Sequence, residues 1–463
     1  MPLFAGAFIA ITAIVWIVAL GTLTRRGLIS RSGLLRAGLW VTVASGGTIT
    51  VLRRIELDAV ASQIVLVSTA VLLFIGAISL FAHRRGEGKL NRALLVVTVI
   101  LTILELVYMF LAGGPIASHV QEESSLAFLP LFVYLVYQSG STREQLLRLA
   151  GSAAAVIVTG SVLLAFILPD FAYAHFQSDQ RRVQVLGLMW RLGGLAPHPN
   201  LLSLTALVAI VIAFAVRSRM RWVVFAMSLL ALGLAESRVA IVSLGVVAVV
   251  AWFFRGGSVV GRALVSAPVI LILVWLIANL VPSEDASVLT SDLATNGRFR
   301  VWALVEGYFW QNPLQGYGPL AFQPDGTSPY LDAGLLHAHN QILQAVAETG
   351  LLGGLLTVVM LAIFVFMALQ RPIRPVYPAL VAAFLASSPT EPFLSLHLYG
   401  MNFAVVPAFL FITAIMSTGM KSEPAPELGA PVAAVRKPAG RQVGRAPHGH
   451  VVHLTAGVRD SRG

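Results

Sequence analysis

Long apolar stretches follow one another along almost the whole of this 463-residue chain. A helix needs roughly 20 apolar residues to cross the hydrocarbon core of a bilayer, and most of the stretches approach that length. The two-residue alternation of a membrane β-barrel is missing, so helices are the only way to satisfy the backbone. The pattern predicts an all-α, polytopic transmembrane helix bundle of about 12–13 spans with one large extracytoplasmic loop. The expected spans lie at 2–23, 37–52, 59–81, 93–112, 125–138, 149–168, 200–216, 222–235, 239–254, 263–281, 350–369, 376–388 and 400–418.

Composition indicates the same class of protein. Hydrophobic residues make up 57% of the chain and charged residues only 11%. A soluble domain carries about 25% charged residues, so this chain has too few to cover a water-facing surface. Cysteine is absent from the sequence, which excludes disulfides, thiolate nucleophiles and cysteine-bound metals.

The formal net charge of +11 is carried mainly by arginine, since the chain has only three lysines. Basic residues gather in alternate short connections, such as 24–36 and 82–92, and the positive-inside rule assigns these to the cytoplasm. Arg53 and Arg54 do not follow this rule, and the connection at 169–199, which also carries arginines, follows it only in part. With thirteen spans the N-terminus lies outside and the C-terminus inside. We interpret the charge as a signal of topology and of contact with membrane lipids, with no nucleic-acid partner.

The span pattern divides the chain into four parts. The last part is rich in Pro, Gly, Ala and Arg and has no apolar periodicity, so we expect a disordered, basic cytoplasmic tail. The expected parts are an N-terminal transmembrane bundle at 1–281, an extracytoplasmic catalytic loop at 282–349, C-terminal transmembrane helices at 350–418 and the tail at 419–463.

A polar segment at 296–354 interrupts the apolar pattern and is where chemistry is expected. Arg298 and Arg300 open it, within the sequence G-R-F-R-V-W. The spacing of Trp302, with Val305 and Phe309, predicts one face of an amphipathic helix lying along the membrane surface. A solvated interfacial helix without a ligand is the plainer alternative.

Two histidines, His337 and His339, stand two residues apart in H-A-H-N. A neutral histidine near an acceptor hydroxyl is a candidate general base. A metal site has weaker support, because the segment lacks the ligand spacing of a zinc site. Asn340 is expected to cap the helix that follows, and Glu348 belongs to a polar stripe along that helix, whose first part ends near Gly350.

Other polar positions have both a functional and a structural interpretation. Gly316 and Gly318, in N-P-L-Q-G-Y-G, let a backbone approach a ligand closely, but glycines also simply make turns. His198 and Asn200 begin the span at 200–216, where capping is the alternative to substrate contact.

Arg238, in A-E-S-R-V-A, lies at the outward edge of a span. An arginine there costs several kcal/mol unless it has a partner, so it is a candidate functional residue. A lipid phosphate suits its planar guanidinium, whereas an ion pair with Glu236 is the structural alternative.

Five motifs in fixed order resemble those of one family. They are H-P-N, S-R, G-R-x-x-x-W, N-P-x-x-G-Y-G and H-N-x-x-L-Q-x-x-x-E-x-G-x-x-G, and they cover residues 197–370. Together they resemble the O-antigen ligase and O-antigen polymerase family of bacterial polytopic membrane glycosyltransferases. The resemblance implies an undecaprenyl-pyrophosphate-linked glycan donor and a glycan or lipid acceptor, used at the extracytoplasmic face of the cytoplasmic membrane. It further implies that neither a metal nor a cofactor takes part.

The resemblance also assigns roles to residues. It implies catalytic roles for Arg238, Arg298 and His339. Attack on the face of the sugar opposite the pyrophosphate would invert the anomeric carbon. This chain departs from the family pattern in its extra His337 and in reading E-S-R where T-S-R is expected. The candidate substrate-binding residues are Arg300, Trp302, His337, Asn340, Glu348, His198, Asn200, Gly316 and Gly318.

Three other functions fit part of the pattern. A polymerase of lipid-linked repeat units differs from a ligase only in its acceptor, which the sequence does not reveal. A transporter of lipid-linked glycans without catalysis accounts for the spans but not for the histidine–asparagine motif. A structural subunit of an envelope complex requires no cluster of titratable residues.

Overall fold

A computed structural model describes most of the expected bundle. By internal contacts the chain forms two units, residues 1–422 and 423–463, and every described residue lies in the first. The expected span at 263–281, all of the span at 400–418 except Met416, and the expected tail lie outside the described residues. The described residues are 2–24, 31–81, 89–111, 128–139, 141–174, 191–216, 219–254, 298–318, 321–322, 329–332, 335, 337–369, 375–389 and 416.

Helices dominate this part of the chain, and the all-α polytopic membrane fold is confirmed. Two short strands, β1 (Tyr173–Ala174) and β2 (Arg191–Leu192), form one antiparallel pair. The helices are α1 (Pro2–Thr24), α2 (Arg31–Arg54), α3 (Asp58–Phe81), α4 (Lys89–Leu111), α6 (Phe128–Gln138), α7 (Arg143–Ile167), α8 (Pro169–Ala172), α9 (Pro199–Ala215), α10 (Arg221–Leu234), α11 (Arg238–Phe253), α14 (Arg298–Phe309), α15 (Pro329–Asp332), α16 (Gln341–Ala368) and α17 (Val376–Ser387).

The expected spans on described residues all coincide with helices, and four of these helices begin four or more residues before the expected span. Helices α2, α4 and α7 start at Arg31, Lys89 and Arg143 instead of residues 37, 93 and 149. The span expected from 350 is the second part of α16, which starts at Gln341 directly after the expected Asn340 cap. The cause in α16 is local, because the Asn340 side chain caps the helix by accepting hydrogen bonds from the N–H groups of Ile342 (2.9 Å) and Leu343 (3.1 Å). The boundary expected between 349 and 350 lies at the point inside α16 where Thr349 and Gly350 leave the helical conformation.

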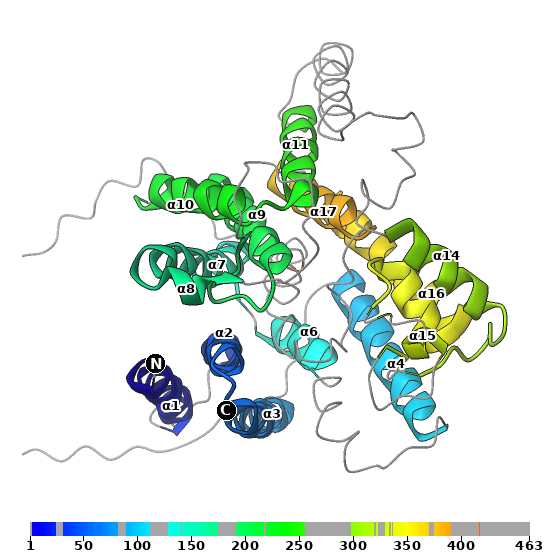
Figure 1. The fold of residues 1–463 in the computed structure, drawn as a ribbon, viewed down its shortest axis with the longest axis horizontal. Coiled ribbons are helices and arrows are strands. Elements are labelled where there is room, and N and C mark those ends of the chain that lie inside the picture. The colour runs from blue at the N-terminus through cyan, green and yellow to red at the C-terminus, as the bar shows by residue number, and fades with distance from the viewer. Residues whose placement is uncertain are drawn as a thin grey trace, which may run out of the picture. The chain divides into compact units, whose positions relative to one another are not determined.

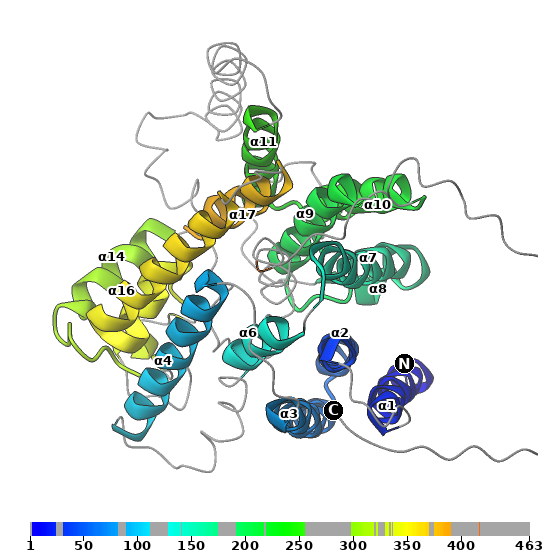
Figure 2. The same ribbon diagram turned by 180° about the vertical axis from the view of Figure 1, so that it is seen from behind.

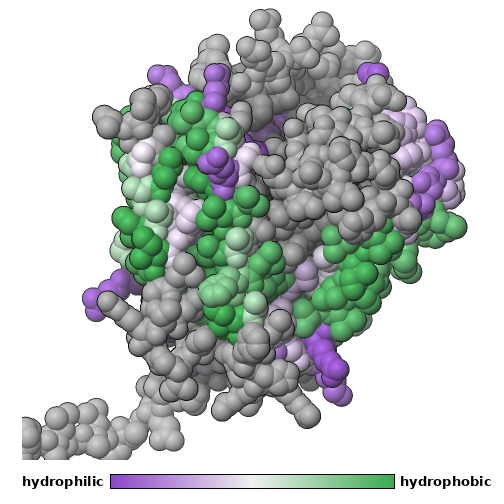
Figure 3. Space-filling model, turned by 90° about the horizontal axis from the view of Figure 1, so that it is seen from below, coloured by the Kyte–Doolittle hydropathy of each residue, from purple (hydrophilic) through white to green (hydrophobic). Residues whose placement is uncertain are grey.

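Five described helices are long and apolar enough to cross a bilayer. Figure 3 shows hydrophobic side chains over much of the described surface on one side, with hydrophilic ones mainly above and below. Shorter apolar helices of 10–17 residues accompany them, among them α9, α10, α11 and α17. The five long candidates are Ser32–Arg54, Ala59–Ser79, Lys89–Tyr108, Arg143–Ile167 and Gln341–Ala368.

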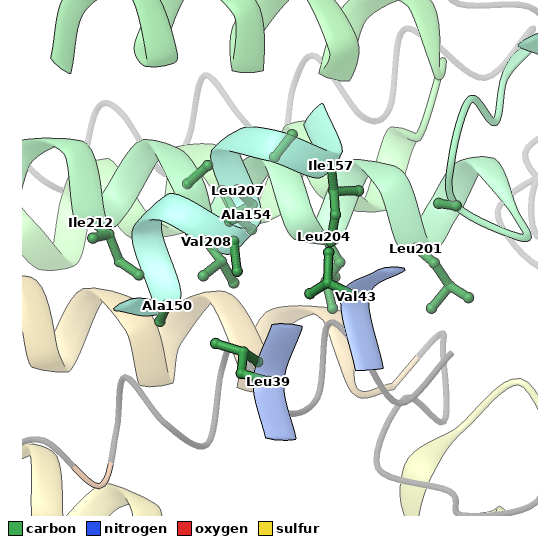
Figure 4. Close-up of a cluster of buried hydrophobic side chains, with 14 of the residues drawn as sticks. Leu39, Val43, Ala150, Ala154, Ile157, Leu201, Leu204, Leu207, Val208 and Ile212 are labelled. Atoms are coloured by element: carbon green, nitrogen blue, oxygen red, sulfur yellow. The ribbon is translucent and has the colours of Figure 1, made fainter. Parts of the chain in front are cut away.

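The main hydrophobic core lies where α2, α7 and α9 meet (Figure 4). Helix α9 is buried at every position from Leu201 to Ile212, as expected for a helix that is apolar on all sides. Ala150 and Ala154 of α7 are fully buried, and such small residues let neighbouring helices approach closely. Helix α9 is therefore the central element of this part of the bundle.

Two further helix pairs position the polar segment. Helix α16 packs along α4, and α11 packs against α17, as both views of the ribbon show (Figures 1 and 2). Helices α14 and α15 cover the first half of α16.

This cover has a small core of its own, separate from the main one. Its centre is Tyr330, whose side chain is fully buried. The Tyr330 ring stacks on Phe322 at 4.8 Å and meets the edges of Tyr317 at 5.1 Å and Tyr308 at 5.5 Å. Aromatic pairs in these geometries stabilise beyond the area they bury. The polar segment thus contains a folded unit and is not only a loop.

Helix α16 changes direction at Thr349 and Gly350. Gly350 has φ 63° and ψ −162°, a conformation that is open almost only to glycine. A turn at 312–318 supplies hydrogen bonds at this point: the Leu351 N–H donates to Pro313 O (2.8 Å), and the N–H groups of Tyr317 and Gly318 donate to carbonyls of α16 (both 2.9 Å). The turn therefore supplies hydrogen-bond partners for the backbone groups at the break.

Gly350→Ala should destabilise the protein. A methyl group there would collide with the carbonyl oxygen of Leu314, on a backbone that alanine already disfavours. We expect a loss of roughly 2–3 kcal/mol, measured as a lower melting temperature in detergent. Gly307→Ala is the matched control, because its methyl group would meet open space in a helix and should stabilise α14 by about 1 kcal/mol. Equal melting temperatures for Gly350→Ala and wild type would refute the packing of turn and break.

Candidate active site

Helices α14 and α16 bring the ends of the polar segment together. Arg298 is the first residue of α14, and the two histidines directly precede α16. The face of α14 that packs inward consists of Val301, Leu304, Val305 and Tyr308. The expected helix is confirmed, but its buried face is rotated from the expected one, because the helix packs onto the Tyr330 core.

The two histidines form a pair. The ring centroids of His337 and His339 lie 3.7 Å apart with the planes tilted by 52°. The backbone N–H of His339 donates to Nδ1 of His337 at 3.3 Å, so a neutral His337 carries its proton on Nε2. His339 has φ 51°, a left-handed backbone that is uncommon outside glycine and often marks functional positions. The left-handed backbone at His339 thus occurs where the imidazole rings of His337 and His339 lie close together.

Burial and charge keep His337 neutral. Burial is the larger cause and the positive charge of Arg298 the second, and together they lower the pKa of His337 from 6.5 to about 4. The positive charge of Arg298 therefore acts on His337, one member of the histidine pair. Among the described residues, no three His, Asp or Glu side chains gather into a metal-binding group.

A row of buried, hydrogen-bonded polar groups holds the loop at 337–340, which carries the two histidines (the histidine loop). The Ala338 N–H donates to Oε1 of Gln344 at 2.7 Å, and Nε2 of Gln344 donates to Oε1 of Glu348 at 2.6 Å. Gln344 and Glu348 are both buried. Asn340 caps the same helix, so these three residues hold the loop and α16 in one arrangement.

Gly316 and Gly318 have a backbone reason for being glycine, and Gly316 has a packing reason as well. Both have positive φ, 68° and 78°. A Cβ on Gly316 would lie 2.7 Å from the carbonyl oxygen of Ala347 in α16. These glycines therefore fit the turn against α16, which is the structural alternative that the sequence left open.

Arg300 and Trp302 differ in their exposure on α14. Arg300 is exposed and Trp302 is half-buried. Nε1 of Trp302 is buried, and Arg298 is the arginine whose charge acts on His337.

A second polar group surrounds the start of α11. Arg238 is the first residue of this helix, and Oγ of Ser237 caps it by accepting from the Ala240 N–H at 3.4 Å. The preceding residue, Glu236, has φ 47° and is buried. Arg191 donates from Nε to the carbonyl of Ala235 at 2.8 Å.

His198 and Asn200 belong to this second group and not to the histidine pair. His198 is the N-cap of α9, where its Nδ1 accepts from the Asn200 N–H at 3.2 Å. Oδ1 of Asn200 accepts from Nη2 of Arg191 at 2.7 Å. The capping interpretation of His198 is confirmed.

The end of α17 connects the two groups. The hydroxyl groups of Ser243 in α11 and Ser387 in α17 lie 3.0 Å apart. Ser387 donates its proton to Ala383 O (2.8 Å), so Ser243 is the donor between them. One residue further, the carbonyl of Ser388 accepts from the Gln341 N–H, the first of α16, at 2.9 Å. The starts of α11 and α16 are thus both fastened to one helix end.

Comparison with known proteins adds a family to this geometry. Residues 223–358 match the family model described as O-antigen ligase. This match supports the O-antigen ligase family, and we call residues 223–358 the O-antigen ligase domain. The resemblance read from the motifs is confirmed. No curated protein matches the chain.

The O-antigen ligase domain begins in α10 and ends within α16. It includes Arg238, Arg298 and the histidine pair, whereas His198 and Asn200 lie before it. Arg191 and Gln344 were not among the site residues expected from the sequence. Arg191 stands in a connection that departed from the positive-inside rule, and that departure was the available signal.

The O-antigen ligase domain should lose stability in acid through His337. The unfolded histidine binds a proton near pH 6.5 and the folded one only near pH 4, so stability is lost as the pH falls between these values. The expected loss at pH 4.5 relative to pH 7 is about 2–3 kcal/mol. Melting temperatures in detergent should fall less steeply with pH in His337→Gln than in wild type. Identical pH profiles would contradict the burial of His337.

Proposed function

We propose that this membrane protein is a glycosyltransferase that moves an oligo- or polysaccharide from undecaprenyl pyrophosphate onto an acceptor hydroxyl. The reaction takes place at the outer face of a bacterial cytoplasmic membrane. The observation that carries the proposal is the close pair of His337 and His339, with the charge of Arg298 acting on His337, within an O-antigen ligase domain.

The chemistry requires a cation for the leaving group and a base for the acceptor. The bond from the anomeric carbon to a pyrophosphate oxygen breaks, and the acceptor oxygen bonds to that carbon from the opposite face, which inverts it. The pyrophosphate leaves with added negative charge, which the guanidinium groups of Arg298 and Arg238 stabilise. These two groups neutralise charge that a metal ion neutralises in other enzymes. The acceptor proton moves to His339.

A neutral His337 favours His339 as the base. A second positive charge at 3.7 Å would lower the affinity of His339 for a proton. Because the pKa of His337 is about 4, this second charge is absent at neutral pH. His337 also orients the loop by accepting the hydrogen bond from the His339 backbone.

The break in α16 supports a site at the membrane surface. The segment from 351 to 368 is about 27 Å long as a helix, close to the roughly 30 Å of the hydrocarbon core. Leu351 and Leu355 are exposed on this segment, as lipid-facing residues are. The nine residues from 341 to 349 rise at most about 13 Å above the break, so the histidine pair lies at headgroup level. The diphosphate of a lipid-linked donor occupies the same level.

The acceptor distinguishes a ligase from a polymerase. A ligase transfers the glycan to another molecule, and a polymerase transfers it to a further lipid-linked repeat unit. The same base and the same cations serve both reactions. We therefore propose the ligase reaction, with polymerisation as the alternative.

Transfer should depend on His339 and Arg298. Purified protein in liposomes receives lipid-pyrophosphate-linked oligosaccharide and candidate acceptors, and the products are sized by gel. His339→Ala should reduce the rate about 10²–10⁴-fold and Arg298→Gln about 10²–10³-fold. Arg221→Gln, which removes an exposed arginine at the start of α10, is the charge-matched control and should retain the wild-type rate.

The products of this assay decide between the functions. A ladder of lengthened glycans on lipid indicates a polymerase, and a single transferred product indicates a ligase. Movement of lipid-linked glycan across the vesicle without a new bond would replace the proposal with the transporter. Wild-type rates in both variants would remove His339 and Arg298 from the mechanism.

The turn at 312–318 should lie at the bilayer boundary. Leu314 is 73% exposed, and its carbonyl accepts a hydrogen bond from the Tyr108 hydroxyl near the end of α4 (3.4 Å). Because the chain lacks cysteine, Leu314→Cys and Glu306→Cys each carry one fluorescent label. Lipids brominated near the headgroup should quench the label at 314 strongly and the label on exposed Glu306 weakly. Equal quenching would place the break in α16 away from the membrane boundary.

A further inference from the structure

The backbone around Arg191 is held in place without the Arg191 side chain. Strand β2 pairs with β1, and the N–H groups of Gly193 and Gly194 both donate to Ala172 O at 3.0 Å. Arg54, at the end of α2, donates to the carbonyls of Phe171 (3.0 Å), Gly194 (2.7 Å) and Ala196 (2.9 Å). The guanidinium of Arg54 also lies 5.2 Å from the centre of the Phe171 ring. This loop is therefore a fixed base from which the Arg191 side chain extends.

The Arg191 side chain reaches the turn between α10 and α11. Its Nε donates to Ala235 O at 2.8 Å, and its Nη2 donates to Asn200 Oδ1 at 2.7 Å. Ala235 is the C-cap of α10 and is fully buried. Carbonyl groups at a helix C-terminus lack partners within the helix and carry partial negative charge, which favours a cation at this place.

The turn that Arg191 holds is short and leads directly to Arg238. Only Glu236 and Ser237 separate Ala235 from the first residue of α11. Glu236 has φ 47°, a conformation that an ordinary residue keeps only when its surroundings impose it. The position of Ala235 thus determines where α11 begins and where the Arg238 side chain starts.

We propose that Arg191 is a positioning residue for Arg238, acting through the carbonyl of Ala235 and not by contact with substrate. This inference rests on the proposed function, in which Arg238 binds the diphosphate of the donor. Arg191 fixes the turn from one side, and the end of α17 fixes α11 from the other through Ser243 and Ser387. The cationic group at the start of α11 is thereby preorganised before the donor binds.

The test is a double-mutant cycle on diphosphate binding. The full-length protein in nanodiscs is titrated with tritiated geranylgeranyl diphosphate, which binds without any transfer reaction. Arg238→Gln should weaken binding about tenfold or more, and Arg191→Gln should do the same. The double variant should bind no more weakly than Arg238→Gln alone, because Arg191 then has nothing left to position.

Two further variants separate positioning from general stability. Arg191→Lys retains a donor and should recover part of the lost affinity. Arg54→Gln weakens the base of the loop without touching the α10–α11 turn directly. Melting temperatures are recorded for all variants, and Arg191→Gln should lose more affinity than an Arg54→Gln protein of equal or lower stability.

The outcomes are distinct. If the losses from Arg191→Gln and Arg238→Gln multiply in the double variant, Arg191 acts independently of Arg238 and the inference is wrong. If Arg191→Gln binds as well as wild type, the inference is equally wrong. If Arg238→Gln binds as well as wild type, Arg238 does not bind the diphosphate. This single variant therefore tests the proposed role of Arg238 separately from that of Arg191.

Discussion

A helix that breaks at the edge of a bilayer leaves backbone N–H and C=O groups that need partners, and the candidate site depends on how α16 meets this need. The turn at 312–318 provides hydrogen bonds on both sides of Gly350. In doing so it fastens the end of α14 to the middle of α16. Arg298, at the start of α14, then acts electrostatically on His337, which lies just before α16.

The electrostatic character of the site follows from this packing. The buried chain from Ala338 through Gln344 to Glu348 holds the histidine loop on the helix. Burial beside a guanidinium then keeps His337 uncharged. A cation for the leaving group and a base for the acceptor hydroxyl can work side by side only if nearby positive charge does not lower the proton affinity of the base too far. The low pKa of His337 removes one source of that repulsion.

Helix α17 connects the histidine loop and Arg298 with a second cation, Arg238. Its last residues contact both α11 and the first turn of α16, so the separation of their starts is fixed by one rigid element. Arg238 and Arg298 come from helices far apart in the sequence. Preorganised groups of this kind cost little reorganisation when charge develops, which is the general advantage of electrostatic catalysis.

Much of the fold was predictable because apolar length and capping residues are local signals. The helices on described residues, the cap at Asn340 and the change of direction near Gly350 all follow from neighbouring residues. The buried face of α14 was not predictable, since it depends on Tyr330, more than twenty residues away. The hydrogen bond from Arg191 to the carbonyl of Ala235 was not predictable either. Every residue has a backbone carbonyl, so the side chain of the acceptor residue gives no signal of this bond.

The central claim is that a lipid diphosphate binds between Arg298 and Arg238 with His339 facing the transferred sugar. A structure of the full chain in a nanodisc with the lipid-pyrophosphate-linked glycan bound tests this most directly. The account predicts diphosphate oxygens within hydrogen-bond distance of both guanidinium groups, and His339 on the side of the anomeric carbon opposite the leaving oxygen. A diphosphate bound away from Arg298, or a sugar whose reactive carbon faces away from His339, would contradict it.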